Sequence, residues 1–282
     1  MGSEPVGRPF VSVVVTVRNE EAHLGALLES LERQEPPFEI VLVDAESRDR
    51  TLEIAEEFRA RHPELLRLER RPCSRGGGRN IGVRAARADY VAFIDGDCIA
   101  DARWLESLRR DLGPRSVVAG RTLTIGKPRY GDLERVELFQ GGYDVTHPSC
   151  NLLYPRALFD RLGGFDTRFI TAEDIDLNLR AVQEGASIRF EPEAIVLHQM
   201  RATFVRFLYP AFWNGYGRKQ LTEKHGTLWP RYRLRRLLAG QKGAIAWSRL
   251  VAALGGYATR MLTGPSQRAA RDRAISGGKP GG

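Results

Sequence analysis

Uninterrupted apolar runs alternate with segments of helical periodicity in the first part of the chain. Residues 10–17 read FVSVVVTV, a β-branched run with too few polar positions to alternate. Such a run is typical of a central strand in a parallel sheet, which is covered on both faces. A helix with one apolar face is expected next, because leucines recur at helical spacing in Leu24, Leu27, Leu28 and Leu31. Pro36 and Pro37 end that helix.

The alternation of strand and helix continues along the chain. Further strands are predicted at residues 38–44, 65–68, 90–95, 117–123, 151–154 and 188–197. The other predicted helices span residues 51–61, 79–87, 104–112 and 173–184. Strands that alternate with helices favour an α/β fold, with a doubly wound, mostly parallel sheet flanked by helices.

Charge is distributed unevenly between the two ends of the chain. Residues 201–282 hold 16 Lys and Arg against two acids, a net charge of +14, whereas residues 1–200 hold 27 basic and 33 acidic side chains, a net charge of −6. A basic segment indicates an anionic partner, such as a phospholipid surface, a phosphorylated lipid or nucleic acid. We therefore expect an extension over 1–9, an α/β domain over 10–200, a basic, mainly helical segment over 201–263 and a mobile tail over 264–282.

The cysteines and the apolar stretches indicate where in the cell the protein is located. The three cysteines are widely spaced and form no CxxC pair, and residues 1–9 lack the apolar core of a secretion signal. Residues 243–259 are interrupted by Arg249 and two glycines, so they fall short of the roughly 20 apolar residues of a membrane span. These features predict a cytoplasmic protein that meets the inner face of the cell membrane only peripherally.

Polar side chains follow three of the predicted strands. The first strand runs into Thr16 and Glu20, the second ends at Asp44, and a later one ends in Asp95-Gly96-Asp97. In a doubly wound sheet ligands bind outside the carboxyl ends of the strands, so these side chains should meet at one site. On a turn that glycine permits, one carboxylate can reach a ribose hydroxyl while the other binds a divalent cation. The alternative is an ordinary Asp-Gly turn after a strand, because Asp and Gly are common turn residues.

Three other features add candidate chemistry. Residues 76–80 read GGGRN and open a predicted helix, where free backbone amides and Arg79 can face a diphosphate. His198 ends the last predicted strand and suits a transition metal such as Mn²⁺, although a lone histidine is more often structural. A helix start carries three carboxylates, which also simply favour a helix N-terminus: Glu173, Asp174 and Asp176.

Taken together, these residues resemble the inverting glycosyltransferase family 2, which has the GT-A fold. The resemblance covers residues 10–200 in the family's order, through VSVVVTVRNEE, IVLVDAESRDRT, GGGRNIGVRAARADYVAFIDGDC, LGGFDTRFITAEDIDLNLRAVQEG and His198. It implies transfer of a sugar from a nucleotide diphosphate sugar, UDP preferred and GDP the alternative, with Mn²⁺ or Mg²⁺ as cofactor. The implied acceptor is a hydroxyl or phosphate on a glycan or a lipid-linked carrier.

The resemblance also implies a role for each candidate residue. Asp174 looks like the catalytic base, with Glu173 and Asp176 supporting it. Asp97 and His198 would hold the metal together with Asp95. The donor would be bound by Thr16, Glu20, Asp44, Arg79 and Asp95.

The sequence departs from the family pattern at two points, which bear on the nucleobase contact and on the number of sugars transferred. Many members have a second Asp after the acidic residue that ends the second strand, where this chain has Ala45 and then Glu46. The family pattern therefore does not assign a residue of this chain to the nucleobase contact at this position. No QxxRW motif occurs beyond the proposed base, and the absence of this mark of processive members favours transfer of a single sugar.

Other functions remain to be weighed against this one. The aromatic and basic residues after position 200 also fit a nucleic-acid-binding protein, but the acidic first 200 residues argue against it. A sugar-nucleotide-binding regulator without turnover would not need the acidic and histidine side chains, and a nucleotidyltransferase would not explain the Glu-Asp helix start. For residues 201–263, an anionic membrane surface is preferred over an ordinary helix that covers the core.

Overall fold

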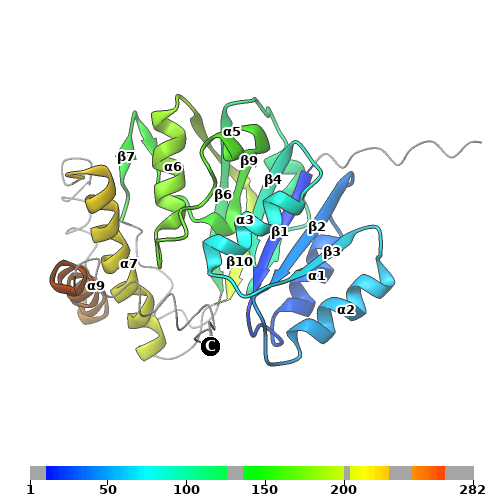
Figure 1. The fold of residues 1–282 in the computed structure, drawn as a ribbon, viewed down its shortest axis with the longest axis horizontal. Helices are drawn as coiled ribbons and strands as arrows, with labels where there is room; N and C mark the ends of the chain where they lie inside the picture. The colour runs from blue at the N-terminus through cyan, green and yellow to red at the C-terminus, as the bar shows by residue number, and fades with distance from the viewer. Residues whose placement is uncertain (1–10, 126–135, 200–203, 229–242, 264–282) are drawn as a thin grey trace, which may run out of the picture.

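The computed structural model describes residues 11–125, 136–199, 204–228 and 243–263. An eight-stranded sheet forms its centre, helices lie on both faces, and a pair of long helices lies at one side (Figure 1). The expected extension over 1–9 and tail over 264–282 lie outside the described residues. The strands across the sheet are β3 (Leu66–Arg70), β2 (Phe38–Asp44), β1 (Val11–Val17), β4 (Tyr90–Asp95), β9 (Leu152–Pro155), β6 (Ser116–Ile125), β10 (Ser187–Gln199) and β5 (Cys98–Ala100).

The sheet is mostly parallel. Strands β3, β2, β1 and β4 are parallel neighbours, and β10 is parallel to β6. Strand β9 runs antiparallel between β4 and β6, and the short β5 runs antiparallel to the outer side of β10. The predicted α/β class with a GT-A-like, mostly parallel sheet is confirmed.

Two hydrophobic cores cover the two faces of the sheet, and β1 contributes to both. Val13 and Val15 pack in one core with α1 (Leu24–Glu32), α2 (Thr51–Arg61) and α4 (Trp104–Leu108). Val14 packs in the other core with α3 (Arg75–Ala85), α5 (Arg156–Arg161) and α6 (Glu173–Gln183). Burial on both faces explains why the sequence of β1 is apolar without alternation.

Helix α3 begins four residues earlier than the sequence predicts. The side chain of Ser74 accepts a hydrogen bond from the amide of Gly77, so the whole glycine run lies in the first turn of the helix. Helix α5, strand β5 and the hairpin of β7 (Phe139–Gln140) and β8 (Tyr143–Asp144) were not predicted. These elements have only two to six residues, too few for a periodic pattern.

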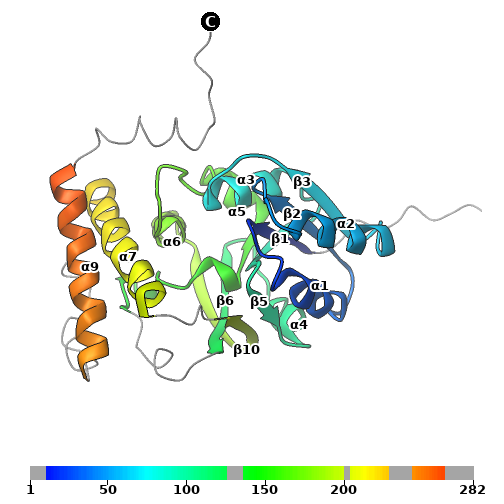
Figure 2. The ribbon, with the colours of Figure 1, turned by 90° about the horizontal axis from the view of Figure 1, so that it is seen from below.

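The described part of the basic segment consists of α7 (Phe204–His225) and α9 (Ala244–Thr263). The two helices lie side by side, with α7 next to α6 (Figure 2). Their backbones approach closely, because a Cβ at Gly215 would lie 1.7 Å from the carbonyl oxygen of Ala253 and one at Gly256 would lie 1.8 Å from that of Phe212. Within the described ranges, neither of these helices nor any other is long and apolar enough to cross a membrane.

Glycines also bring α3 onto β1. A Cβ at Gly82 would lie 2.4 Å from Cγ1 of Val14, and one at Gly78 would lie 2.4 Å from Cγ2 of Thr16. Both neighbours belong to the central strand, so neither can move without disturbing the core. This close approach sets the height of α3, and of Arg79 on it, above the sheet.

We predict that Gly82→Ala lowers the free energy of unfolding. Overpacking a core by one methyl group costs about 1–3 kcal/mol, which outweighs the roughly 0.5–1 kcal/mol that alanine gains over glycine in a helix. Gly25→Ala in α1 is the matched control, since a Cβ there meets nothing within 4 Å and the variant should be stabilised. Urea denaturation of both variants measures the difference, and equal stabilisation would show that α3 has room to move.

Candidate active site

The carboxyl ends of three parallel strands bring Thr16, Asp44 and Asp95 to one edge of the sheet. Thr16 of β1 pairs in register with Asp95 of β4, and the next residue, Val17, pairs with Asp44 of β2. The hydroxyl of Thr16 is buried and has no hydrogen-bond partner among the described residues. A bound ligand, ion or water can supply the hydrogen bond that such a buried polar atom lacks.

Hydrogen bonds tie together the two loops that follow β1 and β2. The Asn19 amide donates to Ser47 Oγ over 2.9 Å, and the Glu20 amide donates to Thr51 Oγ1 over 2.7 Å. Asp44 is fully buried and accepts hydrogen bonds from both the amide and the hydroxyl of Ser47. These hydrogen bonds fix the two loops to each other beside the strand ends.

The same loops contain strained backbone. Asn19 and Glu46 both have φ near +56°, a left-handed conformation that is costly for residues other than glycine. Such strain is kept where the surrounding structure enforces it, and it gathers at functional sites. Here the hydrogen bonds between the two loops supply that enforcement.

Strand pairing brings His198 to Asp97. His198 of β10 pairs in register with Cys98 of β5, and the Gln199 amide donates to the carbonyl of Asp97 over 3.0 Å. As a result Nε2 of His198 lies 3.4 Å from Oδ1 of Asp97, and both side chains are partly exposed. A link of two antiparallel strands thus joins residues that lie about one hundred positions apart in the sequence.

The Asp97 and His198 pair fits a divalent cation. Ligand bonds of about 2.1 Å at right angles separate neighbouring ligand atoms by about 3 Å, close to the observed spacing. Carboxylate oxygen and imidazole nitrogen are suitable ligands for Mn²⁺. The Cys98 sulfur lies in the same group, but its hydrogen bond with Cys150 and its burial raise the pKa of the thiol, which disfavours the thiolate that binds metals.

Glu20 lies against the Asp-Gly-Asp turn. A Cβ on Gly96 would lie 2.7 Å from Val17 and 3.2 Å from Cγ of Glu20, so only glycine fits between them. The turn is therefore packed directly on the end of β1 and on the loop after it. This contact adds Glu20 to the group formed by Thr16 and Asp95.

A single buried cation connects the two halves of the site. Arg79 is 2% exposed, and its Nη2 donates to Asp95 over 2.6 Å while its Nη1 donates to Glu173 over 2.8 Å. Burial opposes ionisation of Asp95, but the charges of Arg79 and Arg75 and the hydrogen bond from Arg79 outweigh it and lower the pKa of Asp95. The end of β4 and the start of α6 are thereby held by one side chain.

The neighbouring Asp174 is held by backbone groups. Its carboxylate accepts hydrogen bonds from the amide of Ile175 over 2.8 Å and from the amide of Ser149 over 3.2 Å. Ala172, just before α6, has φ of +66°, and this left-handed residue turns the chain into the helix. The sequence did not single out Ser149, because a backbone donor leaves no mark in the residue type.

The pKa of Asp174 is raised to about 6. Burial is the main cause, and the negative charge of Glu173 adds to it, while the positive charge of Arg79 and the two amide hydrogen bonds oppose it. A carboxyl group with this pKa is ionised at neutral pH yet basic enough to accept a proton. The arrangement suits a general base.

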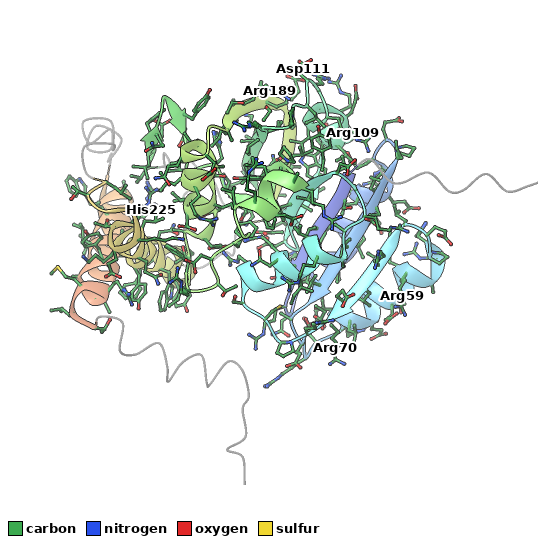
Figure 3. All side chains as sticks on the ribbon, turned by 45° about the horizontal axis from the view of Figure 1, so that its top comes forward. Arg59, Arg70, Arg109, Asp111, Arg189 and His225 are labelled. Atoms are coloured by element: carbon green, nitrogen blue, oxygen red, sulfur yellow. The ribbon has the colours of Figure 1, made fainter. Side chains whose placement is uncertain are left out.

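Asp176 faces a different part of the protein. It is fully buried and pairs over 2.7 Å with each of Arg180, Lys224 and His225. Lys224 and His225 come from α7, and His225 is labelled in Figure 3. The structure therefore groups Thr16, Glu20, Asp44 and Asp95 at one edge, joins Glu173 to Asp95 through Arg79, and pairs Asp97 with His198. Asp176 instead contacts Lys224 and His225 of α7.

Known proteins with similar sequences are glycosyltransferases. The chain is 28% identical to Glycosyltransferase AglE of Haloferax volcanii over 226 residues, which cover 76% of this chain and 74% of that one. It is 29% identical to the pre-mycofactocin glycosyltransferase of Mycobacterium tuberculosis over 209 residues. That match covers 68% of this chain but only 43% of the relative, so the chain spans less than half of that protein.

Solved structures share the fold. Mannosyltransferase PcManGT from Pyrobaculum calidifontis, in complex with GDP-Man and Mn²⁺, aligns over 98% of this chain and 83% of its own with a TM-score of 0.62 and 20% identity. S. aureus TarS 1–349 in complex with UDP-GlcNAc aligns over 88% of this chain and 80% of its own, with a TM-score of 0.57 and 19% identity. At these identities the likeness supports the fold alone.

A family profile decides the membership. The profile described as Glycosyl transferase family 2 matches residues 12–161, more than half of the chain. This range contains all of β1 except its first residue, together with β2, β4 and the Asp-Gly-Asp turn. The chain therefore belongs to glycosyl transferase family 2, and it is a glycosyltransferase.

Proposed function

We propose that the protein is a metal-dependent, inverting enzyme that transfers one sugar from a nucleotide diphosphate sugar to an acceptor. The observation that carries this proposal is the double contact of Arg79, which bonds to Asp95 and Glu173. Asp95 belongs to the proposed donor and metal side, and Glu173 precedes the proposed base. A site that splits a sugar from a diphosphate needs both sides within reach of one anomeric carbon.

Thr16, Glu20, Asp44 and Asp95 form the proposed donor-binding group. The unpaired hydroxyl of Thr16 supports this role, as do the two hydrogen-bonded loops beside it. Arg79 supports donor binding indirectly, by holding Asp95 in place, because its two terminal nitrogens already bond to Glu173 and Asp95. A UDP-sugar is the preferred donor and a GDP-sugar the alternative. Of the solved neighbours, TarS is in complex with UDP-GlcNAc and PcManGT with GDP-Man.

Asp97 and His198, with Asp95 beside them, would hold Mn²⁺ or Mg²⁺. The cation would offset the charge that develops on the departing diphosphate, so no protein proton donor is needed there. The 3.4 Å spacing of Asp97 and His198 supports this assignment. The Mn²⁺ in the PcManGT structure is consistent with it.

Asp174 is the proposed catalytic base. Its carboxylate would take the proton of an acceptor hydroxyl as that oxygen attacks the anomeric carbon from the face opposite the diphosphate, which inverts the anomeric configuration. The raised pKa of Asp174 supports this role. Glu173 supports the base through its charge, and Asp176 supports it by anchoring the same helix.

The acceptor is proposed to be a glycan or lipid-linked molecule at an anionic membrane surface. The outward side of α9 is apolar and exposed, at Trp247, Val251, Leu254, Met261 and Leu262. The segment after residue 200 carries a net charge of +14, which complements an anionic phospholipid surface. An apolar helix face within a basic segment supports contact with lipid more than with nucleic acid.

We predict that Asp174→Asn lowers kcat by about 10²–10⁴-fold, the usual worth of a general base. Affinity for the nucleotide should stay within twofold of the parent, since the change lies on the acceptor side. Tm should not fall, because a carboxyl group whose pKa is raised by folding destabilises the protein once it is ionised. Asp160→Asn on the exposed side of α5 is the control, and an active Asp174→Asn enzyme would rule out the mechanism.

The pH dependence of kcat follows from the same group. The base must be ionised to accept a proton, and the pKa of Asp174 is about 6. Activity should therefore be full near pH 8 and fall about tenfold for each unit below pH 6. A pH–rate profile with substrate in excess measures this fall in activity, and a fall centred near pH 4 would contradict the raised pKa of the proposed base.

Metal dependence is tested by nucleotide binding. Without a cation, the carboxylates of Asp95 and Asp97 repel a diphosphate. Calorimetry should give UDP or GDP affinity that is at least about tenfold weaker in excess EDTA than with Mn²⁺, and Asp97→Asn should lose this difference. Equal affinity with metal and with EDTA would show that no cation joins the nucleotide.

Membrane contact is tested on α9. The double variant Trp247→Ser and Leu254→Ser removes two exposed apolar side chains, so binding to liposomes of phosphatidylglycerol and phosphatidylcholine should fall at least about tenfold. Affinity for the nucleotide should not change. If the parent protein binds no liposomes at low salt, or if the double variant binds them as tightly as the parent, the membrane proposal is wrong.

A further inference from the structure

The segment that leads into the proposed base has no regular secondary structure. Residues 162–172 connect α5 to α6 without a helix or a strand, and their second part, residues 166–172, ends at the left-handed Ala172. A loop of this kind holds one shape only if other parts of the protein fix it. The position of Asp174, two residues further on, depends on that shape.

Helix α7 supplies these contacts through one face. Gln220 is 3% exposed, and its side chain accepts from the amide of Ile170 over 3.4 Å and donates to the carbonyl of Arg168 over 3.1 Å. One turn earlier, a Cβ at Gly217 would lie 2.5 Å from the carbonyl oxygen of Thr171. The backbone of the loop is therefore packed and hydrogen-bonded along α7.

The last turn of α7 fixes both ends of the same region. Nζ of Lys224 lies 2.9 Å from Asp166, at the start of the loop, and 2.7 Å from Asp176, in the first turn of α6. His225 adds a second contact to Asp176 over 2.7 Å. One lysine thus joins two carboxylates that lie on either side of the proposed base in the sequence.

Buried charge makes these contacts specific. Asp176 is fully buried, and a buried carboxylate is stable only with partners in defined positions. Two of its three partners, Lys224 and His225, come from α7, so the first turn of α6 has to keep its place relative to that helix.

We propose that Gln220 and Lys224 of α7 are positioning residues for catalysis, which hold the 166–176 segment in the shape that presents Asp174 to the acceptor. This inference rests on the proposed role of Asp174 as the base. It gives the basic segment after residue 200 a part in the catalytic centre, whereas the sequence indicates only an anionic partner. Neither residue touches substrate in this account.

The test compares Gln220→Ala and Lys224→Met with Lys219→Met in the full-length protein. Lys219 is the matched control, since it lies on the same helix but contacts the ring of Tyr257 in α9. Hydrogen–deuterium exchange should become at least about tenfold faster in residues 166–176 of the first two variants and stay unchanged in the control. Lys224→Arg should restore protection, because it keeps the charge.

Turnover is measured as hydrolysis of UDP-GlcNAc and of GDP-mannose with Mn²⁺, in which water takes the sugar and UDP or GDP is released. A misplaced base should lower kcat by about tenfold to a hundredfold in both variants, with KM for the donor unchanged. Unchanged exchange in residues 166–176 would overturn the proposal, and so would a kcat equal to that of Lys219→Met. If Asp174→Asn is active while exchange still rises, the assignment of the base fails and the mechanical link to α7 stands.

Discussion

The buried guanidinium of Arg79 is the interaction on which the site depends. Its charge lies 2% exposed between Asp95 and Glu173, and burial of an unpaired charge would be prohibitive. Each carboxylate therefore has to stay in place for the other contact to be stable. A planar, forked donor can serve two carboxylates at once, which an ammonium group does less well. The end of β4 and the start of α6 are fixed relative to each other in this way.

Close backbone packing prepares this contact. Gly78 and Gly82 let α3 approach Thr16 and Val14 of β1, which brings Arg79 to the level of the strand ends. On the opposite side, Gly164 in its left-handed conformation lies against Asn80, whose side chain bonds to the backbone of Phe165 in both directions. The chain before α6 is thus fastened to α3 and to α7. The proposed base is held between elements that are far apart in the sequence.

The sequence predicts those parts of the fold and site that rest on local patterns. The apolar run of β1 indicates a strand buried on both faces, and strand ends indicate where Thr16, Asp44 and Asp95 meet. The proximity of Asp97 and His198 depends on the three-residue strand β5, whose pairing with β10 is not visible in a one-dimensional pattern. The contacts of Arg79 and Lys224 are equally invisible, because charge pairing across 94 or 48 positions follows only from the tertiary fold.

The claim that one cation joins the donor side to the base side is tested most directly on Arg79 itself. In Arg79→Lys, one shorter side chain with a single nitrogen replaces the two nitrogens that bond to Asp95 and Glu173, so the forked geometry of the contact is lost. We expect kcat to fall about a hundredfold and the affinity for UDP or GDP with Mn²⁺ to weaken in the same variant. Circular dichroism should show that the fold is kept. If kcat and nucleotide affinity both match the parent enzyme while only Tm falls, Arg79 stabilises the fold alone and the account is contradicted.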